Sequence, residues 1–466
     1  MSDPSRNHYL EGPIPALFAK TAPPIIFVMG MNGLLNVADA LFLGHYVGQD
    51  ALAAVTLVFP LYMLIVACAT LVAGGMSSLL ARHLGARRLD LAQAVFAGAH
   101  WLAVTVALAL IAAYLLVGGA VVRTAAGGDA MIAGMAGTYL RILVLWAPLY
   151  FVLAVNVDAL RNEGHVGMMA AMSLLVSLAN IGFDYVLIAV FHHGVAGSAY
   201  GTVAAQALGL ALILAFRVRG RSALHPAAVL RRATARPWRA ILALGAPQSL
   251  NFIGVALGST AILSALQMAQ SPDYAVTVSA YGIATRVMTF AILPLIGLSQ
   301  AMQTITGNNH GAGLARRTGA SLRFALGAAL VFCLAVQLCV SLFAARIGAG
   351  FVADPAVVAK VAEILPVMVA LFLFAGPLRM IATHFQAIGD APRAALLSLA
   401  KPYLFAIPLT FALALGIGAG AIWWAGPASD ALLAVLTVLV LARGARRQSL
   451  RWGVLPVAAA PVEGRA

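Results

Sequence analysis

The chain has 466 residues, of which 62% are hydrophobic and only 9% are charged, and its mean hydropathy is +0.96. Soluble proteins carry charge on about 25% of their residues, so this composition excludes a water-soluble protein and predicts a polytopic α-helical membrane protein. The net charge of +14 does not indicate nucleic-acid binding, because apolar segments divide the arginines into separate clusters and no continuous basic face forms.

Twelve apolar segments are long enough to cross a bilayer, which takes about 20 residues of helix. The last two are the least separated of the twelve, because only a short glycine-containing stretch divides them. The twelve segments lie at about 23–45, 51–78, 91–118, 131–158, 166–191, 196–216, 241–270, 275–304, 319–346, 357–384, 394–417 and 419–442.

Lysine and arginine are distributed unevenly between the loops on the two sides of the predicted membrane. With a cytoplasmic N-terminus, 22 of the 29 fall in cytoplasmic segments, three in outer loops and four within spans. Cytoplasmic loops of membrane proteins carry an excess of Lys and Arg, so we expect both termini to lie in the cytoplasm.

An internal repeat divides the chain near its midpoint, at the long loop 217–239. Short matches on the two sides recur at offsets of 223, 226 and 225 residues, namely Pro24 with Pro247, 84–86 with 310–312, and 160–164 with 385–389. We therefore expect an N-lobe at 1–225 and a C-lobe at 226–466, each with six helices. Parallel repeats of this kind are related by a pseudo-two-fold axis along the membrane normal.

Two aspartates are predicted to lie inside the membrane at matching depth. Asp39 and Asp184 each lie about six residues before the outer end of their spans, roughly 9–12 Å below the surface at 1.5 Å per residue. Thr202 and Tyr139 lie at a similar depth, and Asn180 shares a helix face with Asp184. An aspartate within a span costs roughly 2.5–3.5 kcal/mol on insertion scales, so the pair predicts a functional site.

Two chemistries fit the pair, and the residue types allow both. Burial and mutual repulsion favour holding one proton between the carboxyl groups. Alternatively, oxygen ligands favour a hard cation such as Na⁺, held by Asp39, Asn180, Asp184 and Thr202. The corresponding positions of the second half are the apolar Ala265 and Leu409, so ion coupling is predicted in the N-lobe alone.

Other chemistry has little basis in the sequence. It contains no phosphate-binding glycine loop, nucleotide motif or nucleophile–base signature, which predicts a protein that is not an enzyme and needs no cofactor. The three cysteines, Cys68, Cys333 and Cys339, lack metal-ligand spacing, so no structural metal is expected. Lys401 precedes Pro402 within a span and either contacts an anionic substrate group or reaches the inner interface.

Several motifs resemble the multidrug and toxic compound extrusion (MATE) family over nearly the whole chain. The run VADALFLGHYVGQDALAAVTLVFP (37–60) resembles the family's first-span signature. The other similar segments are SLLARHLGARR (78–88), ALRNEGH (159–165), YGIATR (281–286) and ILPLIGLSQAMQTITGNNHGAG (292–313).

The chain is most similar to the DinF-like branch, which places its coupling acid in the first span beside a polar N-lobe cluster. The resemblance implies that Asp39, Asn180, Asp184 and Thr202 couple transport to the ion. Secondary polar or substrate-contacting roles are expected for Tyr139, Asn156 and Asn36.

The resemblance also implies a function and a place in the cell. It implies a monomer in the bacterial inner membrane that exports amphipathic or cationic drugs and toxins by alternating access, against H⁺ or Na⁺ and without nucleic-acid partners. The alternative is a lipid-linked saccharide flippase of the same superfamily. Twelve spans with few cations within them weigh against it, and four in-span cations keep it open, namely Arg141, Arg286, Arg379 and Lys401. A sensor or scaffold is a third reading, but neither tail resembles a signalling domain.

Overall fold

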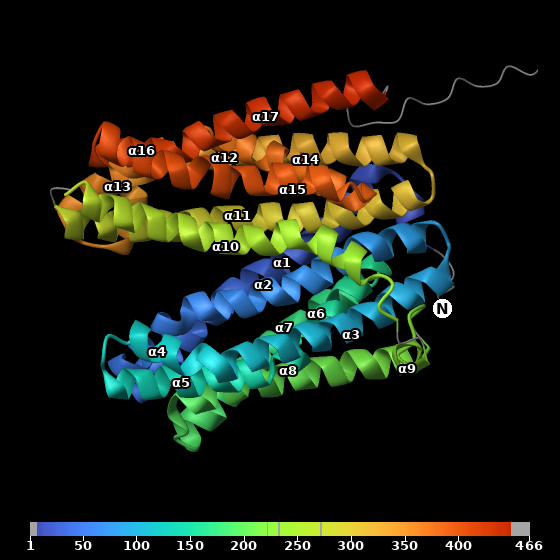
Figure 1. The fold of residues 1–466 in the computed structure, drawn as a ribbon, viewed down its shortest axis with the longest axis horizontal. Coiled ribbons are helices and arrows are strands. Elements are labelled where there is room, and N and C mark those ends of the chain that lie inside the picture. The colour runs from blue at the N-terminus through green and yellow to red at the C-terminus, as the bar shows by residue number, and fades with distance from the viewer. Residues whose placement is uncertain (1–6, 221, 232–233, 271–272, 449–466) are drawn as a thin grey trace, which may run out of the picture. The chain divides into compact units, whose positions relative to one another are not determined.

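The structure is a computed structural model that describes residues 7–220, 222–231, 234–270 and 273–448. The side chains of Asn32, Asn36, Val37 and Ala40 lie outside the described part. Every regular element among the described residues is a helix (Figure 1). The predicted all-α membrane fold is confirmed by this content and by the number of spans.

Seventeen α-helices follow one another in the described residues, and short π and 3-10 segments extend several of them. The α-helices are α1 (Ile14–Phe42), α2 (Gln49–Gly85), α3 (Leu89–Ala113), α4 (Gly119–Ala125), α5 (Ala130–Leu145), α6 (Ala147–Asn162), α7 (Val166–Asp184), α8 (Gly194–Val218), α9 (Ala227–Arg231), α10 (Trp238–Met268), α11 (Tyr274–Gly311), α12 (Ala315–Phe351), α13 (Pro355–Met368), α14 (Phe372–Ile388), α15 (Ala391–Leu399), α16 (Ile407–Gly416) and α17 (Ala425–Gln448). The π segments are η2 (Leu43–Val47), η3 (Tyr114–Gly118), η4 (Tyr185–Val190) and η5 (Ala400–Ala406), and the 3-10 segments are η1 (His8–Leu10) and η6 (Ala419–Trp424).

Ten helical runs in the described residues are long and apolar enough to cross a membrane. Two more spans are bent pairs, α5 with α6 at 51° and α13 with α14 at 47°. Counting each pair as one span gives the twelve that the sequence predicts. The last two spans are separate helices, because the chain leaves α16 and turns at Gly418, whose φ of +121° suits glycine.

The chain divides into two compact units. Within the described residues the N-terminal unit comprises 7–11 and 19–253, and the C-terminal unit comprises 12–18 and 254–448. The boundaries fall inside α1 and α10, so each of these helices contributes to both units. Whether the predicted lobes 1–225 and 226–466 act as the functional units stays a prediction.

The two bent spans occupy corresponding places in the halves of the chain. Asp129 caps α5 by accepting from the N–H groups of Met131 and Ile132, and Asp354, 225 residues later, caps α13 by accepting from Ala356. Interrupted helices in corresponding positions of two repeats are typical of transporter binding regions.

The bend of the second pair is held by one side chain. Gln337 of α12 donates from Nε2 to the Ala370 carbonyl at 2.8 Å and accepts at Oε1 from the Leu373 N–H at 2.9 Å. Backbone groups freed inside a membrane need such partners, because no water is present to replace a lost helical bond.

The N-terminal unit packs α2 against α3, α5 and α6, and α7 against α8. Figure 1 shows α4 and α5 at one end of this unit and α9 at the other. Two indoles fasten the loop that contains α9 to α3. Trp101 donates to the Val229 carbonyl at 3.0 Å, and Trp238 donates to the Gly98 carbonyl at 2.9 Å.

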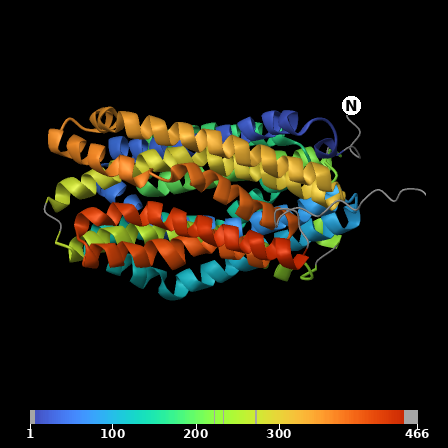
Figure 2. The ribbon, with the colours of Figure 1, turned by 90° about the horizontal axis from the view of Figure 1, so that it is seen from above.

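The C-terminal unit is built around α12, which packs on α11, α13 and α14. In Figure 2, α17 (red) runs beside the segment that contains η5 and α16, with which it is in contact. Close approach of α14 to α12 depends on Gly376, because a Cβ there would lie 2.7 Å from the Cys333 sulfur.

Candidate functional site

Three helices of the N-terminal unit bring the predicted coupling residues together. Asp39 lies on α1, Asn180 and Asp184 lie one turn apart on α7, and Thr202 lies on α8. Asp184 is the last residue of α7, and the next six residues form the π segment η4. A π segment shifts the backbone hydrogen bonding by one residue, and such segments are frequent at functional sites.

The Asn180 amide lies between the two carboxyl groups. In the amide orientation that satisfies both atoms, the Asn180 nitrogen donates to Asp39 Oδ1 at 3.1 Å. The Asn180 oxygen then accepts from the Thr202 N–H and from the Thr202 hydroxyl, each at 3.2 Å. The amide atom that faces Thr202 also lies 3.3 Å from Asp184 Oδ1. The opposite orientation exchanges the donor and acceptor between the same neighbours.

One amide therefore cannot satisfy two ionised carboxylates. It offers an N–H to one carboxyl group and an oxygen to the other, and two carboxylate oxygens are both acceptors only. The carboxyl groups of Asp39 and Asp184 are also close enough to interact directly with each other. The arrangement is balanced by one added positive charge, either a proton on a carboxyl group or a cation held by the oxygens.

Burial makes this requirement strict. Asp184 has no exposed surface and Asn180 is 1% exposed, whereas Asp39 is half-buried. Among the described residues, neither aspartate forms an ion pair with Lys or Arg. Two carboxylates that flank one amide repel strongly in a medium of low dielectric constant, so ionisation of both Asp39 and Asp184 is unfavourable.

Two tyrosines border the pair. Tyr139 of α5 is buried and interacts electrostatically with both aspartates, and Tyr62 of α2 interacts with Asp39 and with Tyr139. The sequence predicted Tyr139 from its depth, but Tyr62 was missed. The position of Tyr62 along the second span gives its depth but not the direction of its side chain. That direction depends on how α2 packs, so the sequence did not place Tyr62 beside the acids.

Gly201 is a second residue that the sequence analysis missed. It precedes Thr202 on α8, and a Cβ at this position would collide with Asp184 Oδ1. The missing side chain lets the Asp184 carboxyl group lie directly against the α8 backbone. A glycine in a membrane helix usually signals only close helix packing, so the sequence alone did not distinguish this one.

Asn156 is placed in a different cluster. It is fully buried on α6, where its Nδ2 bonds to His100 Nε2 at 2.9 Å and its Oδ1 accepts from Arg217 Nε at 3.0 Å. Arg217 pairs with Glu163 at 2.7 Å, and Glu163 also accepts from the Leu224 N–H at 3.0 Å. These bonds tie α3, α6 and α8 to the loop that follows α8, and this loop carries no acid of the pair.

The structure thus gathers Asp39, Asn180, Asp184 and Thr202, with Tyr139 beside them, and separates Asn156 from them by its partners. The side chain of Asn36 lies outside the described residues. The role of all these residues in coupling stays a prediction.

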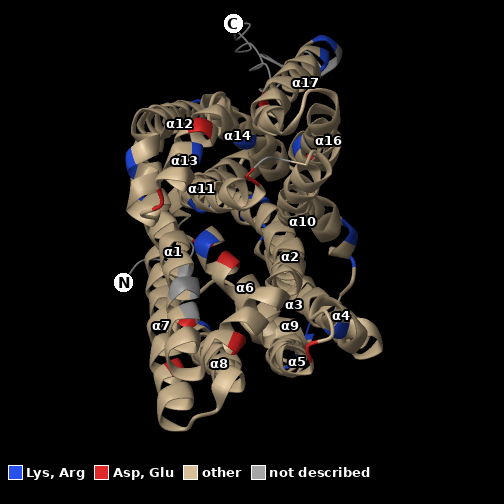
Figure 3. Ribbon diagram, turned by 90° about the vertical axis from the view of Figure 1, so that its left-hand side faces the viewer, with Lys and Arg blue, Asp and Glu red and all other residues tan. Residues whose placement is uncertain are grey.

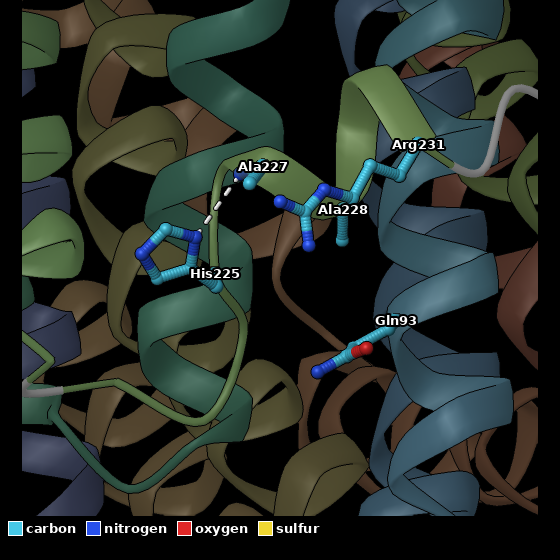
Figure 4. Close-up of a pocket in the computed structure, with 5 residues that line it drawn as sticks. All are labelled: Gln93, His225, Ala227, Ala228 and Arg231. Atoms are coloured by element: carbon cyan, nitrogen blue, oxygen red, sulfur yellow. Dashed lines mark hydrogen bonds between the residues drawn. The ribbon is translucent and has the colours of Figure 1, made fainter.

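A cavity of about 230 Å³ lies at the loop before α10, away from the carboxyl groups. Gln93 of α3, His225 and Arg231 line it together with Ala227 and Ala228 (Figure 4). His225 Nδ1 accepts from the Ala227 N–H at 3.2 Å, so this imidazole supports the turn into α9. The lining comes from α3 and from the loop that contains α9, and it includes no carboxyl group.

Known proteins are similar to this chain along most of its length. The MatE family model matches residues 24–186 and 252–412. Multidrug export protein MepA of Staphylococcus aureus (strain NCTC 8325) is 21% identical over 447 residues, which covers 95% of this chain and 96% of that protein. A FAD transporter of Shewanella oneidensis is 25% identical over 419 residues, which covers 87% of this chain and 89% of that protein.

Solved structures share the fold. A MOP superfamily transporter from Pyrococcus furiosus, described as having a binding pocket of reverse polarity, is 22% identical, with a TM-score of 0.85 over 94% of this chain and 97% of that one. A MATE crystal structure in complex with MaD3S has a TM-score of 0.84 at the same identity and coverage.

Proposed function

The chain belongs to the MatE family, and we propose that it is a secondary active exporter of amphipathic or cationic drugs and toxins, driven by the entry of H⁺ or Na⁺. The similarity to a protein named as a multidrug export protein supports this proposal. The membership in the DinF-like branch is part of the proposal, since it rests on the N-lobe position of the acids. So are the bacterial inner membrane, the cytoplasmic termini and the monomeric state.

The observation that carries the proposal is the Asn180 amide between Asp39 and Asp184. The site needs one positive charge to be satisfied, and it has no Lys or Arg partner among the described residues. A site of this kind binds a proton or a sodium ion reversibly, because binding relieves repulsion and release restores it.

The coupling follows from what that charge does to the helices. With the ion bound, the acid of α1 and the acid of α7 are held together through the ion and through the Asn180 amide. Without it, the two carboxylates repel, and the link between α1 and α7 at this site is weakened. Occupancy of the site therefore biases two arrangements of the N-terminal unit, which is what an ion must do to drive alternating access.

A transport experiment tests the proposal. The purified protein is reconstituted into vesicles that hold a fluorescent organic cation, and H⁺ and Na⁺ gradients are imposed separately. We expect one of the gradients to drive movement of the cation against its own gradient. Transport that is unaffected by both gradients would rule out ion-coupled export.

A second candidate is the lipid-linked saccharide flippase. The cations Arg379 and Lys401 within spans of the C-terminal unit favour it, because such lipids carry phosphate groups. Movement of a labelled lipid carrier between leaflets of reconstituted vesicles tests it, and its absence together with organic-cation transport decides for the exporter.

A further inference from the structure

Two cations lie within spans of the C-terminal unit, where the proposed coupling chemistry does not use them. Arg379 is on α14, and Lys401 is in the π segment η5. A Lys or Arg at the centre of a span costs roughly 2.5–3.5 kcal/mol on insertion scales, so such residues usually serve a ligand or a partner charge.

Lys401 has a partner but remains accessible. Its Nζ lies 2.6 Å from Asp430 Oδ1 on α17, and its side chain is still 36% exposed, whereas that of Asp430 is 8% exposed. The Asp430 carboxylate lies on the buried side of the pair. The Lys401 ammonium group has three N–H donors, so it keeps donors for a second ligand.

Arg379 has no counter-charge. Among the described residues its guanidinium forms no ion pair and no hydrogen bond, and the titratable group that it interacts with is the Cys333 thiol of α12. Cys333 is fully buried, and Arg379 is partly buried. An arginine stays protonated in proteins, so its positive charge cannot be removed by losing a proton.

The three charged residues lie at one level of the unit. Leu378, Ala400 and Leu433 form one buried cluster, and they lie one, one and three residues from Arg379, Lys401 and Asp430 respectively. Cys333 interacts electrostatically with both Arg379 and Asp430. Figure 3 shows Lys or Arg segments on α14 and beside α16 and an acidic segment on α17. The group carries a net charge of +1 from two cations and one carboxylate.

The backbone around these cations is closely held. Gly376 brings α14 against Cys333, and a Cβ at Gly254 of α10 would lie 2.7 Å from Pro402, next to Lys401. Pro402 has no N–H to donate within η5, which is consistent with the local departure from α-helical bonding. The two positive groups are thus placed by packing rather than by long flexible loops.

We propose that Arg379 and Lys401 form a binding site for the anionic group, a phosphate or a carboxylate, of an amphipathic ligand. The planar guanidinium binds such a group through two parallel hydrogen bonds, and Lys401 adds a second charge while Asp430 holds it in place. The apolar side chains of the same cluster, including Phe405, take the apolar part of the ligand. As a substrate site the proposal rests on the proposed function, but the binding itself does not.

Matched probes test the site without any ion gradient. The protein in phosphatidylcholine nanodiscs is titrated with 1-naphthyl phosphate, with uncharged 1-naphthol and with a naphthylmethyl trimethylammonium cation. We expect 1-naphthyl phosphate to bind more tightly than 1-naphthol, and Arg379→Gln to weaken the phosphate probe roughly 10- to 100-fold with little effect on 1-naphthol. Arg379→Lys, which keeps the charge, retains part of the preference and shows that the fold tolerates the change.

Control variants distinguish the effect of this site from that of the coupling site and from the effect of losing any one positive charge. Arg346→Gln removes the same charge from an exposed residue that lies over the Phe343 ring on α12, and it should leave probe binding unchanged. Asp39→Asn should keep the preference for 1-naphthyl phosphate over 1-naphthol, although the proposed function predicts loss of ion-driven transport. Failure of coupling and failure of the anion site are therefore distinguishable.

A further arm identifies the source of the anionic group. Nanodiscs that contain phosphatidylglycerol supply a lipid headgroup that competes for the site. If phosphatidylglycerol weakens the binding of 1-naphthyl phosphate to the wild type but not to Arg379→Gln, the site binds a lipid headgroup. If phosphatidylglycerol leaves the binding to the wild type unchanged, the site binds a solute. Equal binding of 1-naphthyl phosphate and 1-naphthol by the wild type, or unchanged binding in Arg379→Gln, would overturn the proposal.

Discussion

In the N-terminal unit the ion pair of Arg217 and Glu163 is removed from solvent, with side chains 0% and 2% exposed, whereas in the C-terminal unit Lys401 keeps 36% of its side chain exposed while paired with Asp430. Of the two acids of the N-terminal unit, Asp184 is fully buried and Asp39 is half-buried. The buried pair links α8 to the end of α6, whereas the Lys401 ammonium group remains accessible to a ligand.

The acid pair combines both properties. Asp184 is as buried as Arg217. Among the described residues, however, its charged neighbour is the Asp39 carboxyl group and not a Lys or Arg. A buried charge without an opposite charge is costly unless something supplies one, and an ion from solution does so only while it is bound. Burial without a fixed partner charge is thus the feature that separates the proposed coupling site from the structural pair of Arg217 and Glu163.

The largest effect on stability is expected from breaking the buried pair. Glu163→Gln leaves the Arg217 charge unpaired and also weakens the acceptor of Ser222 and Leu224. The free energy of unfolding should fall by about 3–5 kcal/mol, measured by denaturant titration of the purified protein. A loss below about 1 kcal/mol would mean that the buried pair is not what fixes the loop after α8.

Gly201→Ala tests the acid pair through the backbone beside it. The added Cβ would collide with Asp184 Oδ1, so the carboxyl group must move away from Asn180, and ion-driven efflux from vesicles should be lost. Gly182→Ala is the matched control, because a Cβ there meets nothing within 4 Å although the residue is two positions from Asp184. Equal transport by the two variants would contradict the proposed positioning of Asp184.

How far the sequence predicted these features differs between the fold and the site. Hydropathy predicted twelve spans because length and composition decide whether a segment crosses a membrane. Counting 1.5 Å per residue predicted that Asp39, Asp184, Thr202 and Tyr139 share a depth, and the structure places them in one region. Depth along a helix is readable from sequence because it depends only on position in the span.

Orientation about the helix axis is not readable in the same way. Tyr62 and Gly201 face the acids only because of how α2 and α8 pack, and Asn156 binds His100 and Arg217, which are 56 and 61 residues away. The bends between α5 and α6 and between α13 and α14 lie within two of the predicted spans. They depend on tertiary partners such as Gln337, which no local pattern reveals.

A smaller effect is expected at the exposed pair of the C-terminal unit. Lys360 and Glu363 are 2.8 Å apart on α13, with side chains 29% and 57% exposed. Lys360→Gln should change the free energy of unfolding by only about 0–1 kcal/mol in the same denaturant titration, because solvent screens the charges. A loss as large as that of Glu163→Gln would remove the contrast between buried and exposed pairs.

The smallest expected effect is a pH dependence from His165, which lies between α6 and α7. Burial lowers the pKa of His165 below its ordinary value of 6.5, with Glu163 raising it and Arg217 and His8 lowering it. The unfolded chain then binds the proton more readily, so stability is complete above pH 6.5 and falls as the pH drops through the window below it. His165→Gln should flatten the thermal unfolding midpoint across that window, and an unchanged slope would assign the pH dependence to other groups.

The measurement that tests the central claim most directly is ion-driven efflux by Asp39→Asn beside wild type in the same vesicles. The site needs one bound positive charge because two carboxyl groups flank the Asn180 amide. Replacing one carboxyl group by an amide removes that need, so the coupling gradient should no longer drive efflux in the variant. Efflux by Asp39→Asn that is undiminished and still dependent on the gradient would contradict the account.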